Sequence, residues 1–261
     1  MYIIKNKALS IVMTAGVLAV SLIGCSGPNN APLFGGNDLN LQSLMVTKIL
    51  TDRTAVSAAL KWSPVSGADH YELARKQNGG GEVNIGPSKI SKDILIYKDE
   101  NLQENSSYKY IIRAIDSNNK VIQAIKGETE DIKPITSTDL QATEIKDLKL
   151  PPELNKITRD TTLSWSSVAN TDLYYTSITN VSSSKQIFGI FSKETNVNIN
   201  VASSPVNPPD IIKQELPILT GGLEKAVQHS FTVYTIKFNN PELNKATAIG
   251  LRQSKEVSLI L

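Results

Sequence analysis

The sequence predicts an all-β protein, with two tandem β-sandwiches after an export signal and a flexible tether. Three observations predict it. From about Leu41 onward, short segments of alternating apolar and polar residues are separated by turn residues, and long amphipathic helical patterns are absent. The segment LKWSPV (60–65) returns as LSWSSV (163–168), which indicates an internal repeat. The first 24 residues combine a basic start with an uncharged apolar run, which is typical of exported proteins.

Composition excludes several classes of function. The chain has 261 residues, 40% hydrophobic and 20% charged, which fits a globular protein of one or two domains. One cysteine excludes an internal disulfide framework and a cysteine-cluster zinc site, and two histidines leave little room for metal or acid–base chemistry. The formal charge of +2 falls to near zero once Lys5 and Lys7 leave with the signal, so no basic surface for nucleic acid is expected. We expect no metal and no cofactor.

The N-terminus predicts a lipid anchor. Residues 8–24 carry no charge and are shorter than the roughly 20 residues that span a bilayer. They end at Leu22-Ile23-Gly24-Cys25, which resembles the bacterial lipobox. The resemblance implies that residues 1–24 are a lipoprotein signal peptide, that Cys25 is diacylated through its sulfur, and that its new amine is acylated. An uncleaved helical anchor and an ordinary signal peptide are the alternatives. Residues 25–40, rich in Gly, Pro and Asn, are expected to be a flexible tether.

The repeat extends beyond the tryptophans. A tyrosine follows each tryptophan by nine residues, and a leucine precedes each later strand. The landmarks of the first unit are Trp62, Tyr71, Leu102, Tyr108 and Tyr110; those of the second are Trp165, Tyr174, Leu223, His229 and Phe231. The tryptophans are 103 residues apart and the leucines 121, so the second unit contains an 18-residue insertion, at about 202–222.

These landmarks resemble the fibronectin type III family of immunoglobulin-like β-sandwiches. The resemblance implies one domain at 41–133 and a second, with the insertion, at 134–261. It implies that the landmark residues other than His229 are structural core, and that Tyr108 is a tyrosine corner whose hydroxyl bonds back to the backbone. His229 departs from the family, so no phenolic bond is expected there. The polar linker at 127–146 predicts some motion between the domains.

No motif in the sequence predicts catalysis. The nucleophile elbow, the zinc-protease helix, the phosphate loop and the dinucleotide loop are all missing. Asp69 and His70 are neighbours, but adjacent strand residues point to opposite faces, so His70 is expected to be a surface loop histidine rather than part of a relay. The segment 116–120 lacks the glycine and glutamate of a calcium loop and predicts a hairpin turn. We expect no catalytic residue, and the protein is predicted not to be an enzyme.

The insertion leaves two interpretations open. It contains four prolines and a short predicted helix that begins near Pro209 and stops before Pro217. Its apolar side chains either form a ligand-binding surface, or cover an open end of the sandwich or pack against the first domain. The candidate binding residues are Ile211, Ile212, Leu216 and Ile218. The aromatic residues left as sugar-stacking candidates are Tyr97, Tyr175, Phe188, Phe191 and Tyr234.

The expected function follows from the anchor and the modules. The chain is predicted to be an exported envelope lipoprotein, held by Cys25 on an outer membrane or cell surface. Its modules are expected to act without catalysis, in protein interaction, in adhesion or as spacers, with an extracellular or envelope protein or a polysaccharide as partner. The alternatives are a carbohydrate-binding surface module and an accessory domain of an extracellular enzyme system.

Overall fold

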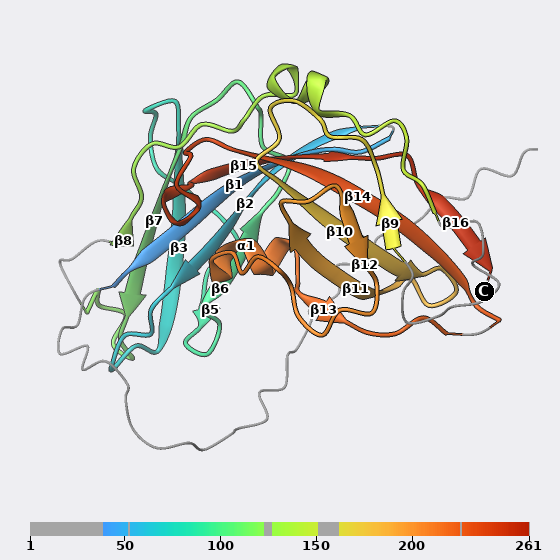
Figure 1. Ribbon diagram of the computed structural model, residues 1–261. Helices are drawn as coiled ribbons and strands as arrows, with labels where there is room; N and C mark the ends of the chain where they lie inside the picture. The colour runs from blue at the N-terminus through green and yellow to red at the C-terminus, as the bar shows by residue number, and fades with distance from the viewer. Residues whose placement is uncertain (1–38, 52, 123–126, 151–161, 225, 261) are drawn as a thin grey trace, which may run out of the picture. The chain divides into compact units, whose positions relative to one another are not determined.

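The computed structural model describes residues 39–261, apart from residues 52, 123–126, 151–161, 225 and 261 (Figure 1). The predicted signal peptide, Cys25 and nearly all of the predicted tether lie outside the described residues. Within the described residues the chain forms sixteen strands, one short α-helix and two 3₁₀ helices. The predicted all-β fold is confirmed.

The first half of the described chain contributes eight strands. They are β1 (Leu41–Ile49), β2 (Thr54–Trp62), β3 (His70–Gln77), β4 (Val83–Asn84), β5 (Ile90–Ser91), β6 (Ile96–Asp99), β7 (Tyr108–Ile115) and β8 (Gly127–Glu128). A five-stranded sheet has the order β4-β3-β7-β8, with β5 also paired to β3. Strands β1, β2 and β6 belong to a different, larger sheet, which faces it across the first core.

The second half begins with a 3₁₀ helix and contains the α-helix. Its elements are η1 (Thr138–Thr143), β9 (Thr162–Ser164), β10 (Leu173–Asn180), β11 (Lys185–Ser192), β12 (Asn196–Asn198), α1 (Asp210–Glu215), β13 (Leu219–Thr220), β14 (Gln228–Phe238), η2 (Leu243–Lys245), β15 (Ala248–Gln253) and β16 (Val257–Ile260). Strands β9 and β12 form a two-stranded sheet. The remaining strands join the larger sheet.

One nine-stranded sheet runs through both halves of the chain. Its order is β13-β11-β10-β14-β15-β1-β2-β6, with β16 also paired to β14. The joint is a parallel pairing of β1 with β15, in register from Met45 opposite Ala248 to Ile49 opposite Arg252. Figure 1 shows β1 and β15 side by side in the middle of this sheet. The sheet therefore crosses the predicted domain boundary at 133/134, and the motion expected from the polar linker is opposed by a continuous hydrogen-bonded ladder.

Strand β1 is apolar on both of its faces. Side chains alternate across a strand, yet Leu44, Met45 and Val46 are all fully buried. Met45 packs into the first core, with Trp62, while Leu44 and Val46 face the opposite side of the sheet. Burial on both faces is the condition in which a strand carries a continuous apolar run.

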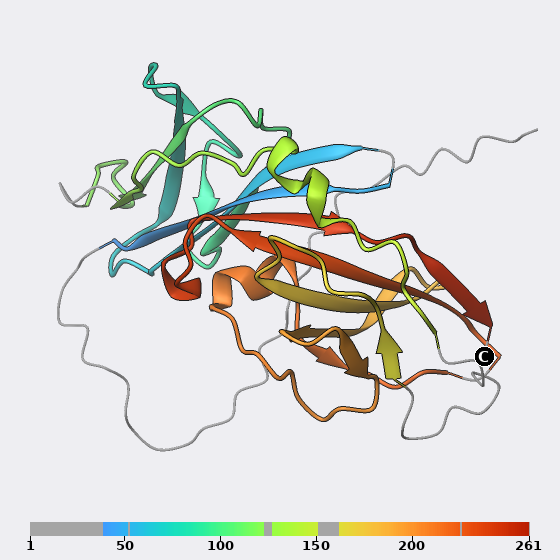
Figure 2. The ribbon, with the colours of Figure 1, turned by 45° about the horizontal axis from the view of Figure 1, so that its top comes forward.

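The linker and the insertion cover opposite faces of the sheet near the joint (Figure 2). Helix η1 contacts β15, where Leu140 lies against the bare backbone of Gly250. A side chain at position 250 would place its Cβ 2.5 Å from Leu140 Cδ2, so glycine is needed for this close approach. Helix α1, from the insertion, contacts β1 and β2 on the other face.

Candidate functional site

The predicted core residues of the two repeats occupy matching environments. Trp62 and Tyr71 meet edge to face with ring centroids 5.7 Å apart, and Trp165 and Tyr174 do so at 5.3 Å. The Tyr71 hydroxyl accepts a hydrogen bond from the Val65 N–H at 2.8 Å, and the Tyr174 hydroxyl accepts one from Val168 N–H at 3.1 Å. The structure buries Trp62, Tyr71, Leu102, Tyr108, Tyr110, Trp165, Tyr174 and Phe231. Leu223 is half-buried against the second core.

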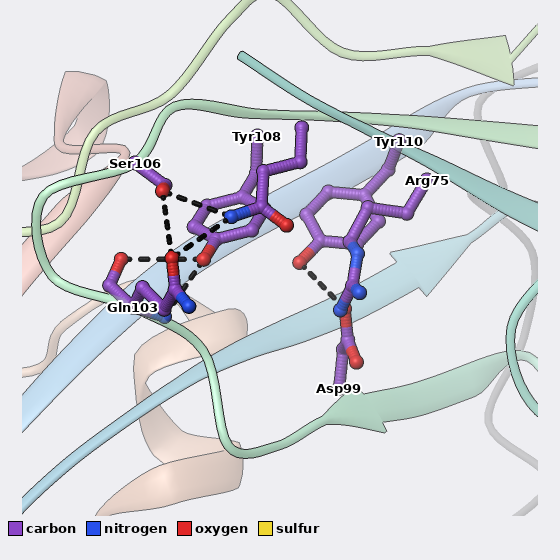
Figure 3. Close-up of polar contacts among 7 residues, drawn as sticks. Arg75, Asp99, Gln103, Ser106, Tyr108 and Tyr110 are labelled. Atoms are coloured by element: carbon purple, nitrogen blue, oxygen red, sulfur yellow. Dashed lines mark hydrogen bonds and ion pairs between the residues drawn. The ribbon is translucent and has the colours of Figure 1, made fainter. Parts of the chain in front are cut away.

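Tyr108 makes the bond expected of a tyrosine corner (Figure 3). Its hydroxyl accepts from the Gln103 N–H at 2.7 Å and donates to the Gln103 carbonyl at 3.2 Å. The Ser106 hydroxyl donates to Gln103 Oε1 at 3.3 Å, which holds the same loop from its other side. These bonds fix the crossover that leads into β7.

His229 replaces the corner tyrosine with an imidazole bond that the sequence did not predict. The side chain is fully buried, and its Nε2 accepts from the Glu224 N–H at 3.3 Å. The spacing of five residues is the same as that between Gln103 and Tyr108, and in each case the donor follows the landmark leucine. A ring nitrogen of His229 therefore accepts the backbone hydrogen bond that the phenol oxygen accepts in the first unit.

Removing either corner acceptor is expected to destabilise the fold. Tyr108→Phe and His229→Phe each leave a backbone N–H without its acceptor, which costs about 1–3 kcal/mol of unfolding free energy. His229→Gln, which can offer an amide oxygen to the same N–H, should lose less than His229→Phe. Urea denaturation measures the loss, and an unchanged midpoint and slope in Tyr108→Phe would refute the corner.

A buried ionic cluster links the two sheets of the first sandwich (Figure 3). Asp99, on β6, accepts from Arg75 Nη1 at 2.8 Å and from the Tyr110 hydroxyl at 2.9 Å, both on the facing sheet. The Arg75 guanidinium also lies 5.6 Å from the centre of the Tyr108 ring. Burial, and next the charge of Asp99, raise the pKa of Tyr110 far above its usual value. The phenol therefore stays protonated and acts as a fixed donor, which is a structural role.

His70 differs from its expectation. It is buried rather than exposed in a loop, because it begins β3, and its Nδ1 lies 2.9 Å from Asp69 Oδ2. The neighbours therefore do contact each other. The open cleft beside them, about 420 Å³, is lined by Asp69, Tyr71 and Ser117 among others, but not by His70. The pair thus has the contact of a relay, but only its aspartate lines the cleft.

The other chemical candidates are accounted for by local structure. Asp116 Oδ1 accepts from the N–H groups of Asn118 and Lys120, both at 2.8 Å, which makes 116–120 the predicted hairpin turn and lowers the pKa of Asp116. Across the described ranges, no three His, Cys, Asp or Glu side chains gather as a metal site. No helix among the described residues is both long and apolar enough to cross a membrane.

The candidate binding residues of the insertion pack into a core cluster. Ile211, Ile212 and Leu216 are buried and Ile218 is partly buried, in a cluster that also contains Leu44 and Val46 of β1. These four residues therefore do not form an exposed binding surface, which corrects that interpretation in favour of packing against the first domain. The physical reason is that β1 leaves an apolar face on the outer side of its sheet, and α1 covers it.

Glu215 fastens the end of α1 to the first sandwich. Its carboxylate is 3.0 Å from Lys48 Nζ and 3.0 Å from Lys98 Nζ, and its side chain is only 5% exposed. Burial acts to raise the pKa of Glu215, but the two ammonium groups outweigh burial and bring the pKa below its usual value. Charged Glu215 is therefore the form that holds the insertion in place.

The ion pairs of Glu215 with Lys48 and Lys98 predict a pH dependence of stability. Because the folded pKa lies below the ordinary value of 4.5, the stabilisation is complete above that pH and is lost as the pH falls through the lower folded pKa. The unfolding free energy of the parent should exceed that of Glu215→Gln by about 1–3 kcal/mol at neutral pH. Urea midpoints at several pH values should show the difference shrinking below pH 4.5. Asp210→Asn, at an exposed carboxylate of the same helix, is the control and should leave the midpoint nearly unchanged. A difference between the parent and Glu215→Gln that stays constant at all pH values would contradict a role for the ion pairs of Glu215.

Comparisons with known proteins give matches to solved structures at low sequence identity and low TM-score. No protein-family model and no curated protein sequence matches the chain. A two-domain fibronectin type III segment of chicken tenascin is similar over 82% of this chain and 98% of its own, with 16% identity and a TM-score of 0.27. The fibronectin domains FN1–FN3 of chicken CNTN1 match 85% of this chain and 62% of theirs, with 11% identity and a TM-score of 0.40. A pectate lyase from Pectobacterium carotovorum matches 43% of this chain and 31% of its own, with 18% identity and a TM-score of 0.25.

Proposed function

We propose that the chain is an exported, lipid-anchored envelope protein whose two β-sandwiches serve as a non-catalytic module for protein interaction or adhesion. The anchor is acylated Cys25, and the tether of residues 25–40 leads directly into β1. The proposed division into units at 41–133 and 134–261 follows the repeat, while one sheet unites them.

The place of β1 in the sheet is the observation that carries this proposal. A force on a tethered surface protein enters the fold at the first strand after the tether. Here that strand is paired with β2 along its whole length and, from Met45 onward, also with β15, and its central residues are buried on both faces. An edge strand could be peeled away one bond at a time, whereas removing β1 breaks two ladders together. The fold is thus suited to hold a load between a membrane and a bound partner.

The aromatic residues favour a protein partner over a polysaccharide. Sugar binding needs aromatic faces open to solvent. Of the five candidates, Tyr175, Phe188 and Phe191 are buried, and Tyr97 and Tyr234 are only partly exposed. We therefore keep polysaccharide binding, and a role beside an extracellular enzyme, as outcomes of the test.

The anchor is tested by metabolic labelling with a fatty-acid analogue in a bacterial host. The parent chain should be labelled, and Cys25→Ser should not, because Cys25 is the sole thiol. Globomycin should cause the lipidated precursor to accumulate. Equal labelling of the parent and Cys25→Ser would overturn the lipid anchor. Surface crosslinking of the labelled protein, with a polysaccharide column run in parallel, then separates a protein partner from a glycan.

A further inference from the structure

An Asn-Gly pair lies in the turn that follows β3. Asn78 precedes Gly79, and no other asparagine in the sequence is followed by glycine. The Gly80 N–H donates to the Gln77 carbonyl at 2.9 Å, and both central residues have positive φ, 52° at Asn78 and 70° at Gly79. These are the features of a type I′ turn. Both residues of the pair are exposed to solvent.

An Asn-Gly pair can react with itself. The backbone nitrogen of the glycine attacks the side-chain amide carbon of the asparagine, because glycine has no side chain to obstruct that approach. A bond forms between this nitrogen and Cγ, the Cγ–Nδ2 bond breaks, and the side-chain nitrogen leaves as ammonia with the proton that the backbone nitrogen gives up. Water then opens the cyclic imide at one of its two carbonyls. The product is an aspartate or, where the original peptide bond is the one cleaved, an isoaspartate.

The fold holds the Asn78 amide away from this reaction. Its Oδ1 accepts from the Ser107 N–H at 2.8 Å, and its Nδ2 donates to the Ser106 hydroxyl at 3.2 Å. The Asn78 N–H also donates to the Ser107 carbonyl at 2.9 Å. A residue in the left-handed conformation places the next nitrogen on the opposite side of the Cα–C bond from Cβ, whereas ring closure needs the two on the same side. The closed turn therefore protects the amide.

The hydroxyl that holds this amide belongs to the loop of the tyrosine corner (Figure 3). Ser106 Oγ also accepts from Gln77 Nε2 at 2.9 Å and donates to Gln103 Oε1 at 3.3 Å. The Gln103 backbone is in turn bonded to the Tyr108 hydroxyl. Opening of this loop therefore releases the amide. Slow chemistry on an open form proceeds at a rate set by the population of that form, when opening and closing are fast.

We propose that Asn78 is a modification site whose deamidation is controlled by the tyrosine corner. While the corner is closed the amide is protected, and each opening of the corner allows ring closure. The products do not restore the network, because a carboxylate has no N–H to donate to Ser106 and an isoaspartate lengthens the backbone of the turn. A reversible opening in the first sandwich thus becomes permanent. The reaction depends on neither the lipid anchor nor a partner, so it is testable on the chain alone.

Peptide mapping by mass spectrometry measures the reaction, and labelling with isoaspartyl methyltransferase detects the isoaspartate. The full chain is incubated at neutral pH, unfolded in guanidinium chloride or folded in the same concentration of sodium chloride. We expect the unfolded chain to convert at Asn78 at least about tenfold faster than the folded chain. Asn78→Gln, whose side chain would have to close a larger ring, is the control and should convert in neither state. Equal rates in the two states would overturn the protection, and no conversion in the unfolded chain would overturn the site.

The two corners of the chain provide a matched pair of variants. Tyr108→Phe removes the hydroxyl that holds Gln103, and His229→Phe removes the equivalent acceptor in the second unit. We expect Tyr108→Phe to raise the rate in the folded chain at least about fivefold, because the lost bonds increase the open population by that factor or more. His229→Phe should leave the rate near that of the parent. Equal acceleration by both variants would overturn control by the corner, because global unfolding would then be what exposes the amide.

Two milder variants test the steps separately. Ser106→Ala removes the hydroxyl partner of the amide and should also raise the rate in the folded chain; an unchanged rate would overturn the protective role of that bond. Asn78→Asp gives the first product directly and should unfold at a lower urea concentration than the parent. Asn170→Asp, at another exposed asparagine with positive φ, is its control and should shift the midpoint less. Equal shifts in these two variants would contradict a permanent opening.

Discussion

Leu44→Asp is expected to separate the two sandwiches and to lower the unfolding free energy by about 3–5 kcal/mol. Leu44 is fully buried in the cluster between the sheet and the insertion. A carboxylate there has lost its water and has no cation paired with it, since Lys48 is already bound to Glu215. The change removes apolar contact on the very face that holds α1 against β1.

The tryptophans allow this to be measured in each sandwich separately. Trp62 lies in the first core and Trp165 in the second. Trp62→Phe and Trp165→Phe each leave a single tryptophan, which reports on one core. Without a further change, the two cores should unfold together at a common midpoint, because one sheet spans both cores. Leu44→Asp should give two different midpoints. Gln42→Asp, at an exposed position of the same strand, is the control and should shift stability by no more than about 0.5 kcal/mol. Two midpoints in the parent would contradict a continuous sheet.

Asp99→Ala is expected to lower the unfolding free energy by about 2–4 kcal/mol, because it leaves the partly buried Arg75 and the buried Tyr110 without their partner. The Arg75 guanidinium would lose its counter-ion and the Tyr110 hydroxyl its acceptor. Arg75 is 24% exposed, so water recovers part of the loss, and the expected cost is below that of a fully buried pair.

A double-mutant cycle with Tyr110→Phe separates the two bonds. Tyr110→Phe alone leaves Asp99 paired with Arg75 and should cost less than Asp99→Ala. The two changes together should cost less than the sum of the single changes, since both remove the same hydrogen bond. Asp99→Asn keeps an acceptor for the phenol and should lie between the parent and Asp99→Ala. Denaturant titration of the parent, the two single variants Asp99→Ala and Tyr110→Phe, and the double variant measures the coupling, and strict additivity would show that Asp99 and Tyr110 are not coupled.

Several structural features could be predicted from short stretches of the sequence. The apolar alternation and the repeated tryptophan predicted strands, and the strands are there. The family resemblance implied that the Tyr108 hydroxyl bonds back to the backbone, and it does, to Gln103. Such features depend on a few neighbouring positions, which sequence displays directly.

Other features were missed because they depend on partners far away in the chain. His229 was expected to leave the corner unbonded, since spacing alone does not show that an imidazole reaches the Glu224 N–H. His70 was expected at the surface, and the structure buries it. The apolar run at 44–46 was a signal of burial on two faces, but it did not identify the strand that pairs with it.

The sequence by itself determined the kind of structure: alternation, turn residues and repeated aromatic landmarks are local, and they are sufficient for an all-β chain. Only the tertiary structure decided that β1 pairs with β15, that the insertion faces inward, and that Glu215 meets Lys48 and Lys98. The reason is physical. Two parallel strands about 200 residues apart are not joined by a short turn, so no local sequence signal indicates that they pair. The energy of the pairing comes from surfaces that exist only once both strands are in place.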